Sequence, residues 1–187
     1  DIIYSLKPNS YILDMDVKAN NLEGFFPSNT KSMQIEWTED MRQQEKGYDF
    51  ETRYATITYR DTNGDTQELS VTGSDAEEDE FEEKAEWIAY KTQFFSQIFI
   101  ADSPFSINSM SSSQLEKGSG YLKTYQTSLT TAFDTKGIKP SSFHFYLGPN
   151  KFSTLAKNEE LLASEEDLDL QSLVYMGWPV IKWINRF

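Results

Sequence analysis

The sequence predicts a mainly β protein, an antiparallel β-sandwich with short α-helices at its C-terminal end. Three observations support this fold class. Apolar and polar residues alternate along 11–18 and again along 33–38, which is the period of a strand with one buried face. Asn63-Gly64 lies between two strand-like runs and is a strong hairpin signal. Helical spacing of apolar residues is confined to the end of the chain.

Turn residues divide the first half of the chain into short strands. The segment Lys7-Pro8-Asn9-Ser10 places proline where a type I turn favours it, so we expect it to join two strands. The runs 54–60 and 67–72 flank Asn63-Gly64 and are expected to pair with each other. A meander of hairpins is therefore predicted.

Three later runs are rich in β-branched and aromatic residues and supply further strands, at 87–100, 121–133 and 142–147. Lys136-Gly137 predicts a turn between the last two of these runs. This spacing of short strands is typical of a sandwich.

Helical patterning begins at Gly148-Pro149, where proline suits the first turn of a helix that should reach about Asn158. A second helical segment is expected within 161–174, ending before Gly177. The predicted organisation is a sandwich portion at 1–147, a helical C-terminal part of the same domain at 148–176, and a terminal amphipathic helix at 177–187.

The terminal segment is amphipathic and aromatic. Pro179 suits the first position of a helix. From that start one face is apolar and another is basic, formed respectively by Val180, Trp183, Ile184 and Phe187 and by Lys182 and Arg186. Two interpretations follow: the helix docks on its own domain, or it lies flat at a membrane surface.

Composition narrows the classes of function. The chain has 187 residues and a formal net charge of -13, so it is long enough for one domain with its own core and it repels phosphate backbones. A nucleic acid is therefore a poor partner. The chain has no cysteine, which removes thiol catalysis, cysteine-ligated zinc and disulfides. No window approaches the ~20 apolar residues of a transmembrane helix.

Two motifs superficially indicate chemistry. Asp61-Thr-Asn-Gly-Asp65 resembles a calcium loop, but Thr72 stands where the bidentate glutamate belongs, so we favour a hairpin turn and expect no metal. His144 is the only histidine, and it alternates with Phe143 and Phe145 in a strand-like run without a nucleophile context. We interpret it as an ordinary strand histidine and expect no catalytic residue.

The acidic run 75–86 could bind cations or a basic partner. Like charges packed this closely favour exposed, extended chain, so a solvated acidic loop is the preferred interpretation.

Four stretches resemble one protein family. They are Tyr175-Met-Gly-Trp-Pro-Val-Ile-Lys-Trp-Ile-Asn-Arg-Phe187, Phe145-Tyr-Leu-Gly-Pro-Asn-Lys-Phe152, Trp87-Ile-Ala-Tyr-Lys-Thr-Gln-Phe-Phe95 and Tyr11-Ile-Leu-Asp-Met-Asp-Val-Lys-Ala-Asn20. Together they resemble the end of the large periplasmic domain of YidC, the bacterial inner-membrane protein insertase family, just before its second transmembrane helix. The acidic run 75–86 and the Ser-rich run 108–120 have no counterpart in this resemblance.

The resemblance implies a supersandwich-like fold and a non-enzymatic role. The chain would be a periplasmic accessory domain of an insertase and chaperone that helps membrane proteins insert, fold and assemble, alone or with the Sec translocon, without a cofactor. Its partners would be the transmembrane insertase core of the same protein, Sec components and the periplasmic side of the inner membrane. The residues expected at that membrane interface are Trp178, Val180, Lys182, Trp183, Ile184, Arg186 and Phe187.

Two other classes of function stay open from the residues alone. A carbohydrate-binding or carbohydrate-active β-sandwich protein is the leading alternative, because related folds occur among sugar-handling enzymes, although fold analogy is weak support. A free-standing periplasmic peptide-binding module is the other.

Overall fold

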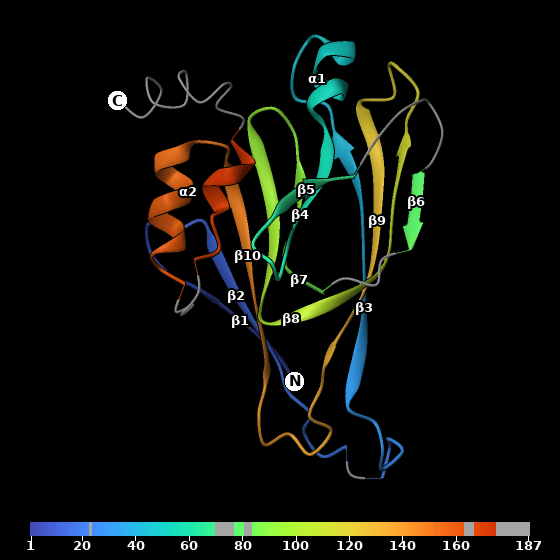
Figure 1. Cartoon of the computed structure of the whole chain (residues 1–187), viewed down its shortest axis with the longest axis vertical. Helices are drawn as coiled ribbons and strands as arrows, with labels where there is room; N and C mark the ends of the chain where they lie inside the picture. Colours follow the sequence, from blue (N-terminus) through green and yellow to red (C-terminus); the bar gives the residue numbers. More distant parts are fainter. Residues whose placement is uncertain (23, 70–76, 81–83, 163–166, 175–187) are drawn as a thin grey trace.

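The computed structural model describes residues 1–22, 24–69, 77–80, 84–162 and 167–174. Within these residues the chain forms a ten-stranded antiparallel sheet that is folded into two facing halves by one shared strand. That strand is β8 (Phe95–Gln114), which is 20 residues long. Its first part pairs with β10 (Ser141–Pro149) and β7 (Lys84–Lys91), and its second part pairs mainly with β9 (Tyr121–Ala132) and β6 (Glu77–Glu80). Figure 1 shows β8 passing from one half to the other.

Each half has its own order of strands. The larger half follows the order β1-β2-β10-β8-β7-β4-β5, in which β1 is Ile2–Leu6, β2 is Ile12–Val17, β4 is Thr56–Asp61 and β5 is Thr66–Glu68. In the smaller half β3 (Ser32–Arg42) pairs with β9, which in turn pairs with β8. The predicted antiparallel β-sandwich with short C-terminal helices is confirmed.

Aromatic side chains fill the space between the two halves. Trp37 of β3 stacks on Tyr90 of β7 with ring centroids 3.8 Å apart, and Tyr90 contacts Tyr125 of β9 at 5.0 Å. The Tyr90 hydroxyl donates to the Trp37 carbonyl oxygen at 2.8 Å, which satisfies a polar group inside the core. Burial raises the pKa of Tyr90. This stack joins the halves at the centre of the sandwich.

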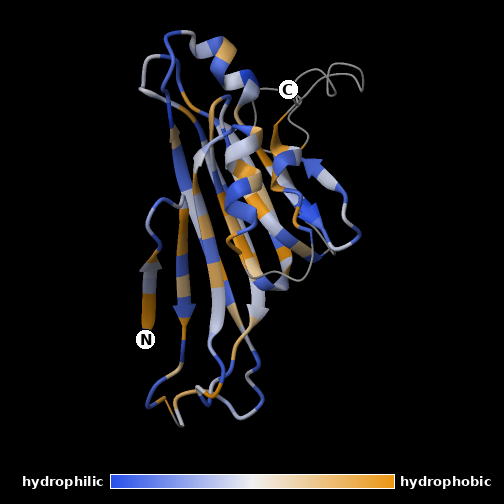
Figure 2. Cartoon of the chain, turned by 90° about the vertical axis from the view of Figure 1, so that its left-hand side faces the viewer, coloured by the Kyte–Doolittle hydropathy of each residue, from blue (hydrophilic) through white to orange (hydrophobic). Residues whose placement is uncertain are grey.

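A second core lies on the outer face of the larger half, under the helical segments. Helix α2 (Phe152–Glu159) and the 3₁₀ turn η1 (Leu170–Leu173) cover this face, as seen at the left of Figure 1 and in front of the sheet in Figure 2. Trp87 is fully buried there, and its indole N–H donates to the carbonyl oxygen of Leu168 at 2.8 Å. The buried members of this core are Ile12, Trp87, Ala89, Ile98, Ile100, Tyr146, Leu155, Leu162, Leu168, Leu170 and Leu173.

Polar contacts also fasten the segment 167–174 to the sheet. The Arg60 guanidinium pairs with Glu86 of β7 at 3.1 Å and with Asp169 at 3.8 Å. The Glu159 carboxylate accepts hydrogen bonds from the backbone N–H groups of Asp169 and Leu170 at 2.9 and 3.0 Å. Burial raises the pKa of Glu159, and these two hydrogen bonds oppose the shift. The segment 167–174 is therefore joined by polar contacts both to the sheet and to α2.

Several predicted elements have different partners or boundaries. The turn at Lys136-Gly137 is present, but β10 pairs with β2 and β8, not with β9, so the predicted meander does not extend to the last strand. Pro149 is the last residue of β10, and α2 begins only at Phe152. Among the described residues of 161–174, only η1 is helical. Strand pairing over long sequence separation carries no local signal, which is why the partner of β10 was predicted wrongly. The helix starts later than predicted because Gly148 and Pro149 pair with Ser96 and Phe95 of β8, whereas its end near Asn158 is confirmed.

Two segments contain structure that the sequence analysis did not predict. Helix α1 (Tyr48–Tyr54) precedes β4, so Tyr54 is helical and not the start of a strand. The acidic run 75–86 is not simply a loop, because it contributes β6 and the start of β7, where Glu86 is 8% exposed. No helix in the described residues is long and apolar enough to cross a membrane.

Candidate functional site

The membrane-interface residues predicted from the sequence lie outside the described residues. All seven, from Trp178 to Phe187, belong to the segment 175–187. The division of the chain at 147 and 176 likewise stays a prediction.

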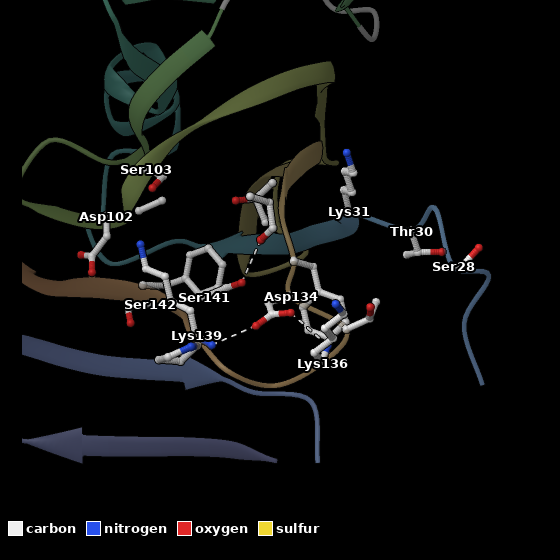
Figure 3. A pocket seen from close by; sticks show the side chains of 17 residues that line it. Ser28, Thr30, Lys31, Asp102, Ser103, Asp134, Lys136, Lys139, Ser141 and Ser142 are labelled. Carbon is white, nitrogen blue, oxygen red and sulfur yellow. Dashed lines mark hydrogen bonds between the residues drawn. The ribbon is translucent and has the colours of Figure 1, made fainter. Parts of the chain in front are cut away.

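A pocket of about 480 Å³ lies at one end of the sandwich. Three separated segments line it: 28–31 before β3, 101–103 in β8, and 131–143 from the end of β9 to the start of β10. The loops 24–31 and 133–140 lie at the bottom of Figure 1. In Figure 3, Asp102 and Ser103 lie on one side of the pocket, whereas Ser28, Thr30 and Lys31 lie on the other. Its volume is within the range of small-molecule sites.

The pocket combines an apolar base with a polar rim. Phe143 and Ala101, which are cross-strand neighbours in β10 and β8, contribute apolar surface and belong to the core between the two halves. Three lysines, Lys31, Lys136 and Lys139, line the rim. The rim is therefore unusually basic for a chain with a net charge of -13.

The Asp134 carboxylate organises the turn that carries two of these lysines. It accepts hydrogen bonds from the backbone N–H groups of Lys139 at 2.9 Å, Lys136 at 3.0 Å and Ile138 at 2.7 Å. These bonds lower the pKa of Asp134, the bond from Lys139 contributing most. Figure 3 shows Asp134 between Lys136 and Lys139. At the centre of the turn, Gly137 has φ +68°, and a Cβ there would lie 2.1 Å from the Ala19 carbonyl oxygen.

We expect Asp134→Asn to lower the melting temperature at neutral pH. Because the folded-state pKa of Asp134 is below its unfolded value, its stabilising contribution is present above the unfolded pKa and is lost as pH falls through the folded pKa. The difference in melting temperature between wild type and variant should therefore stay constant from about pH 7 to about pH 5 and shrink as the pH falls from about 5 to about 2. Thermal melts across that range measure it. Asp49→Asn, at a surface carboxylate, is the control, and a difference that is constant with pH would contradict the assignment.

His144 lies in β10, as the sequence predicted, and both of its ring nitrogens face carboxylates. Nδ1 is 2.7 Å from Asp14 Oδ1 and Nε2 is 2.9 Å from Asp102 Oδ1. Asp14 is its cross-strand neighbour in β2, and Asp102 lies where β8 changes partners. The histidine thus ties β2, β10 and β8 together beside the pocket, and Asp102, which lines the pocket, is engaged by it.

The calcium-like segment at Asp61 forms the predicted hairpin. β4 and β5 pair across it, and Gly64 has φ +89°. Asp61 Oδ1 accepts the backbone N–H groups of Asn63 and Asp65 at 2.8 and 3.0 Å. This carboxylate therefore shapes the turn. The residues that the structure describes contain no group of three or more acidic or histidine side chains arranged to hold a metal ion.

A shallower apolar depression lies at the other end of β10. Tyr11, Phe95 and Leu147 line it and are 47%, 54% and 46% exposed. Gly148 allows the backbone to pack closely against the Tyr11 ring, because a Cβ at this position would lie 2.9 Å from that ring. Neither this depression nor the basic pocket was predicted from the sequence. Only the turn at Lys136-Gly137 gave a local signal, since each cavity is built from segments far apart in the chain.

Comparison with known proteins places this chain in a family. Residues 1–187, the whole chain, match the YidC periplasmic domain. The chain is similar to proteins called membrane protein insertase YidC from Phocaeicola vulgatus, with 41% identity over 187 residues, and from Bacteroides fragilis, with 40% over 187 residues. The corresponding protein of Porphyromonas gingivalis is 33% identical over 187 residues. In each case the alignment covers 100% of this chain and 30% of the relative. The chain belongs to the YidC periplasmic domain family.

Proposed function

We propose that this chain is the periplasmic accessory domain of an inner-membrane protein insertase and chaperone, which helps membrane proteins insert, fold and assemble, alone or with the Sec translocon. The observation that carries this proposal is the match of all 187 residues to the YidC periplasmic domain. The relatives favour it over the carbohydrate-binding alternative, because each of those named above is a membrane protein insertase. A β-sandwich alone does not distinguish the two.

The domain acts by contact and position, without covalent chemistry or a cofactor. In support, the side chains that most resemble catalytic groups are engaged in holding the fold. His144 joins three strands, Asp134 caps a turn, and Glu51 accepts backbone hydrogen bonds between α1 and the residues before it.

The firmly attached segment 167–174 supports a mechanical role. The buried Trp87 indole, the Arg60 ion pairs and the Glu159 carboxylate all hold it to the sandwich. A helix at 177–187 would then have a defined position relative to the domain. We propose that it lies at the periplasmic surface of the inner membrane, with Val180, Trp183, Ile184 and Phe187 buried among lipids beside Trp178, and with Lys182 and Arg186 at the headgroups.

The transmembrane core of the same protein and components of the Sec translocon are the proposed protein partners. The length of the relatives supports the first of these, because the chain covers 30% of each and the rest of an insertase must contain its membrane-spanning part. The Sec components follow from the family resemblance alone.

A domain exchange tests the proposal. In the YidC protein of Phocaeicola vulgatus, the 187 residues that match this chain would be deleted or replaced by it. We expect the exchange to restore membrane-protein insertion above the level of the deletion, because the domain supplies an accessory contact that the deletion removes. Protease accessibility of a newly made membrane protein in cells depleted of their own insertase measures insertion.

Two variants of the exchanged protein test the terminal helix. Trp183→Glu introduces a charge on the apolar face and should reduce insertion, whereas Asn185→Glu introduces the same charge off that face and should not. Thermal melts of the purified 187-residue variants establish that both remain folded. An exchanged protein that is produced at normal levels yet inserts no better than the deletion would overturn the proposal.

A further inference from the structure

We propose that the basic pocket at the end of the sandwich binds a small anionic amphiphile, a molecule with one anionic headgroup on an apolar body. The proposal concerns the pocket lined by segments 28–31, 101–103 and 131–143, and it is independent of the insertase role.

The charge of the rim selects an anion. The ammonium groups of Lys31, Lys136 and Lys139 make no hydrogen bond or ion pair with the described residues. Both carboxylates of the pocket, in contrast, are engaged: Asp102 with His144 at 2.9 Å, and Asp134 with three backbone N–H groups. The charged groups of the rim that can still bind a ligand are therefore the three ammonium groups. The hydroxyls of Ser28 and Ser103 also line the pocket and can donate hydrogen bonds.

The base of the pocket requires an apolar body on the ligand. Phe143 and Ala101 belong to the buried core and reach the pocket from the sheet, and Phe133 and Pro140 add apolar surface from the loop. A small inorganic anion would leave this surface wet and most of the 480 Å³ unfilled. A hydrocarbon chain would cover it while the headgroup stays at the lysines.

The general field of the protein opposes anions, so binding must be local. With 30 acids and 17 bases, the chain repels negatively charged ligands at a distance. The lining holds three lysines and two carboxylates, a formal excess of one positive charge, and one of these carboxylates, Asp134, has Lys136 as a nearby charge. Because nearby charges dominate within about 10 Å at moderate salt, this local excess acts against the long-range field of the chain.

Isothermal titration calorimetry on the 187-residue chain tests the proposal with decanoate as the probe. Acetate has the headgroup without the chain, and decyltrimethylammonium has the chain with the opposite charge. We expect decanoate to bind, acetate to bind much more weakly, and decyltrimethylammonium not to bind at the pocket. Equal affinity for decanoate and decyltrimethylammonium would overturn the proposal, because it would indicate an unselective apolar surface.

Matched variants locate the site. The triple variant Lys31→Gln, Lys136→Gln and Lys139→Gln should weaken decanoate binding by about tenfold, if each exposed ion pair contributes about half a kcal/mol. Lys46→Gln, Lys151→Gln and Lys157→Gln remove the same charge from exposed positions outside the pocket, and should leave affinity within about twofold. An equal loss in both triple variants would refute a local site.

If the lysine variant is poorly folded, a variant that fills the pocket tests whether decanoate binds there. Ser103 is exposed at the pocket wall, so Ser103→Trp should occupy the cavity without changing its charge. With an unchanged melting temperature, this variant should lose decanoate binding. Undiminished binding would place the ligand elsewhere and overturn the assignment.

Discussion

Replacing Trp87 with alanine is expected to lower the free energy of unfolding by about 3–5 kcal/mol, the cost of removing a large aromatic side chain from a packed core. Trp87 is 0% exposed, and its indole N–H satisfies the Leu168 carbonyl oxygen at 2.8 Å. The substitution therefore leaves a cavity under η1 and removes a hydrogen bond between the sheet and the segment 167–174. Urea unfolding followed by tryptophan fluorescence and by circular dichroism measures the change.

Two further substitutions separate packing from the general effect of mutation. Trp87→Phe keeps an aromatic ring but removes the donor, so its cost should be smaller than that of alanine. Ile138→Ala removes apolar atoms from a side chain that is 80% exposed and should change stability by less than about 0.5 kcal/mol. If Trp87→Ala were no more costly than Ile138→Ala, the second core would not contribute to stability as described.

The second large effect is expected at Glu51 of α1, which is 1% exposed. Its carboxylate accepts the backbone N–H groups of Gln44, at 3.0 and 3.1 Å to its two oxygens, and of Glu45 at 2.9 Å. Glu51→Ala leaves both donors without these acceptors, and should lower the free energy of unfolding by about 3 kcal/mol. Chemical denaturation measures this cost.

The controls for Glu51 distinguish its hydrogen bonds from helix propensity. Asp49→Ala changes an acidic residue of the same helix whose side chain is 77% exposed, and should cost little. Glu51→Gln retains one acceptor oxygen and should recover part of the stability lost in alanine. If Glu51→Ala and Asp49→Ala lowered the free energy of unfolding equally, the hydrogen bonds of the buried Glu51 carboxylate would not stabilise α1 as described.

The strands that the sequence predicted are those whose alternation reflects one buried face. Met33, Ile35 and Trp37 point to the core from β3, and the alternating run at 12–17 forms β2. The pattern identifies a strand but not its partner, and in β2 it misses that Ile12 is buried in the second core while Tyr11 is 47% exposed. The turn at Lys136-Gly137 therefore predicted the wrong neighbour for β10. Its true neighbours β2 and β8 precede it by roughly 130 and 45 residues in the register of His144 with Asp14 and Ile100.

Tertiary contacts explain what sequence patterns missed. Helix α1 is seven residues long, too short for a helical period to be visible, and Glu51 holds it from within. The basic pocket could not be predicted either, because Lys31 and Lys139 converge only after β3 and β9 pair and β10 is placed. The terminal helix was the clearest functional signal in the sequence, and it stays a prediction.

The position of β10 constrains the order in which the chain acquires its structure. The hairpin of β1 and β2 has β10 as its only described bridge to the rest of the sheet, since β2 pairs with β1 on one side and with β10 on the other. When the chain emerges N-terminal end first, β1 and β2 cannot pair with the rest of the sheet until β10, which ends at Pro149, has also emerged. Such non-local closure is slow relative to local folding. The larger half of the sandwich is thus completed late, after most of the domain has emerged, and β2 lacks one of its two partner strands during that interval.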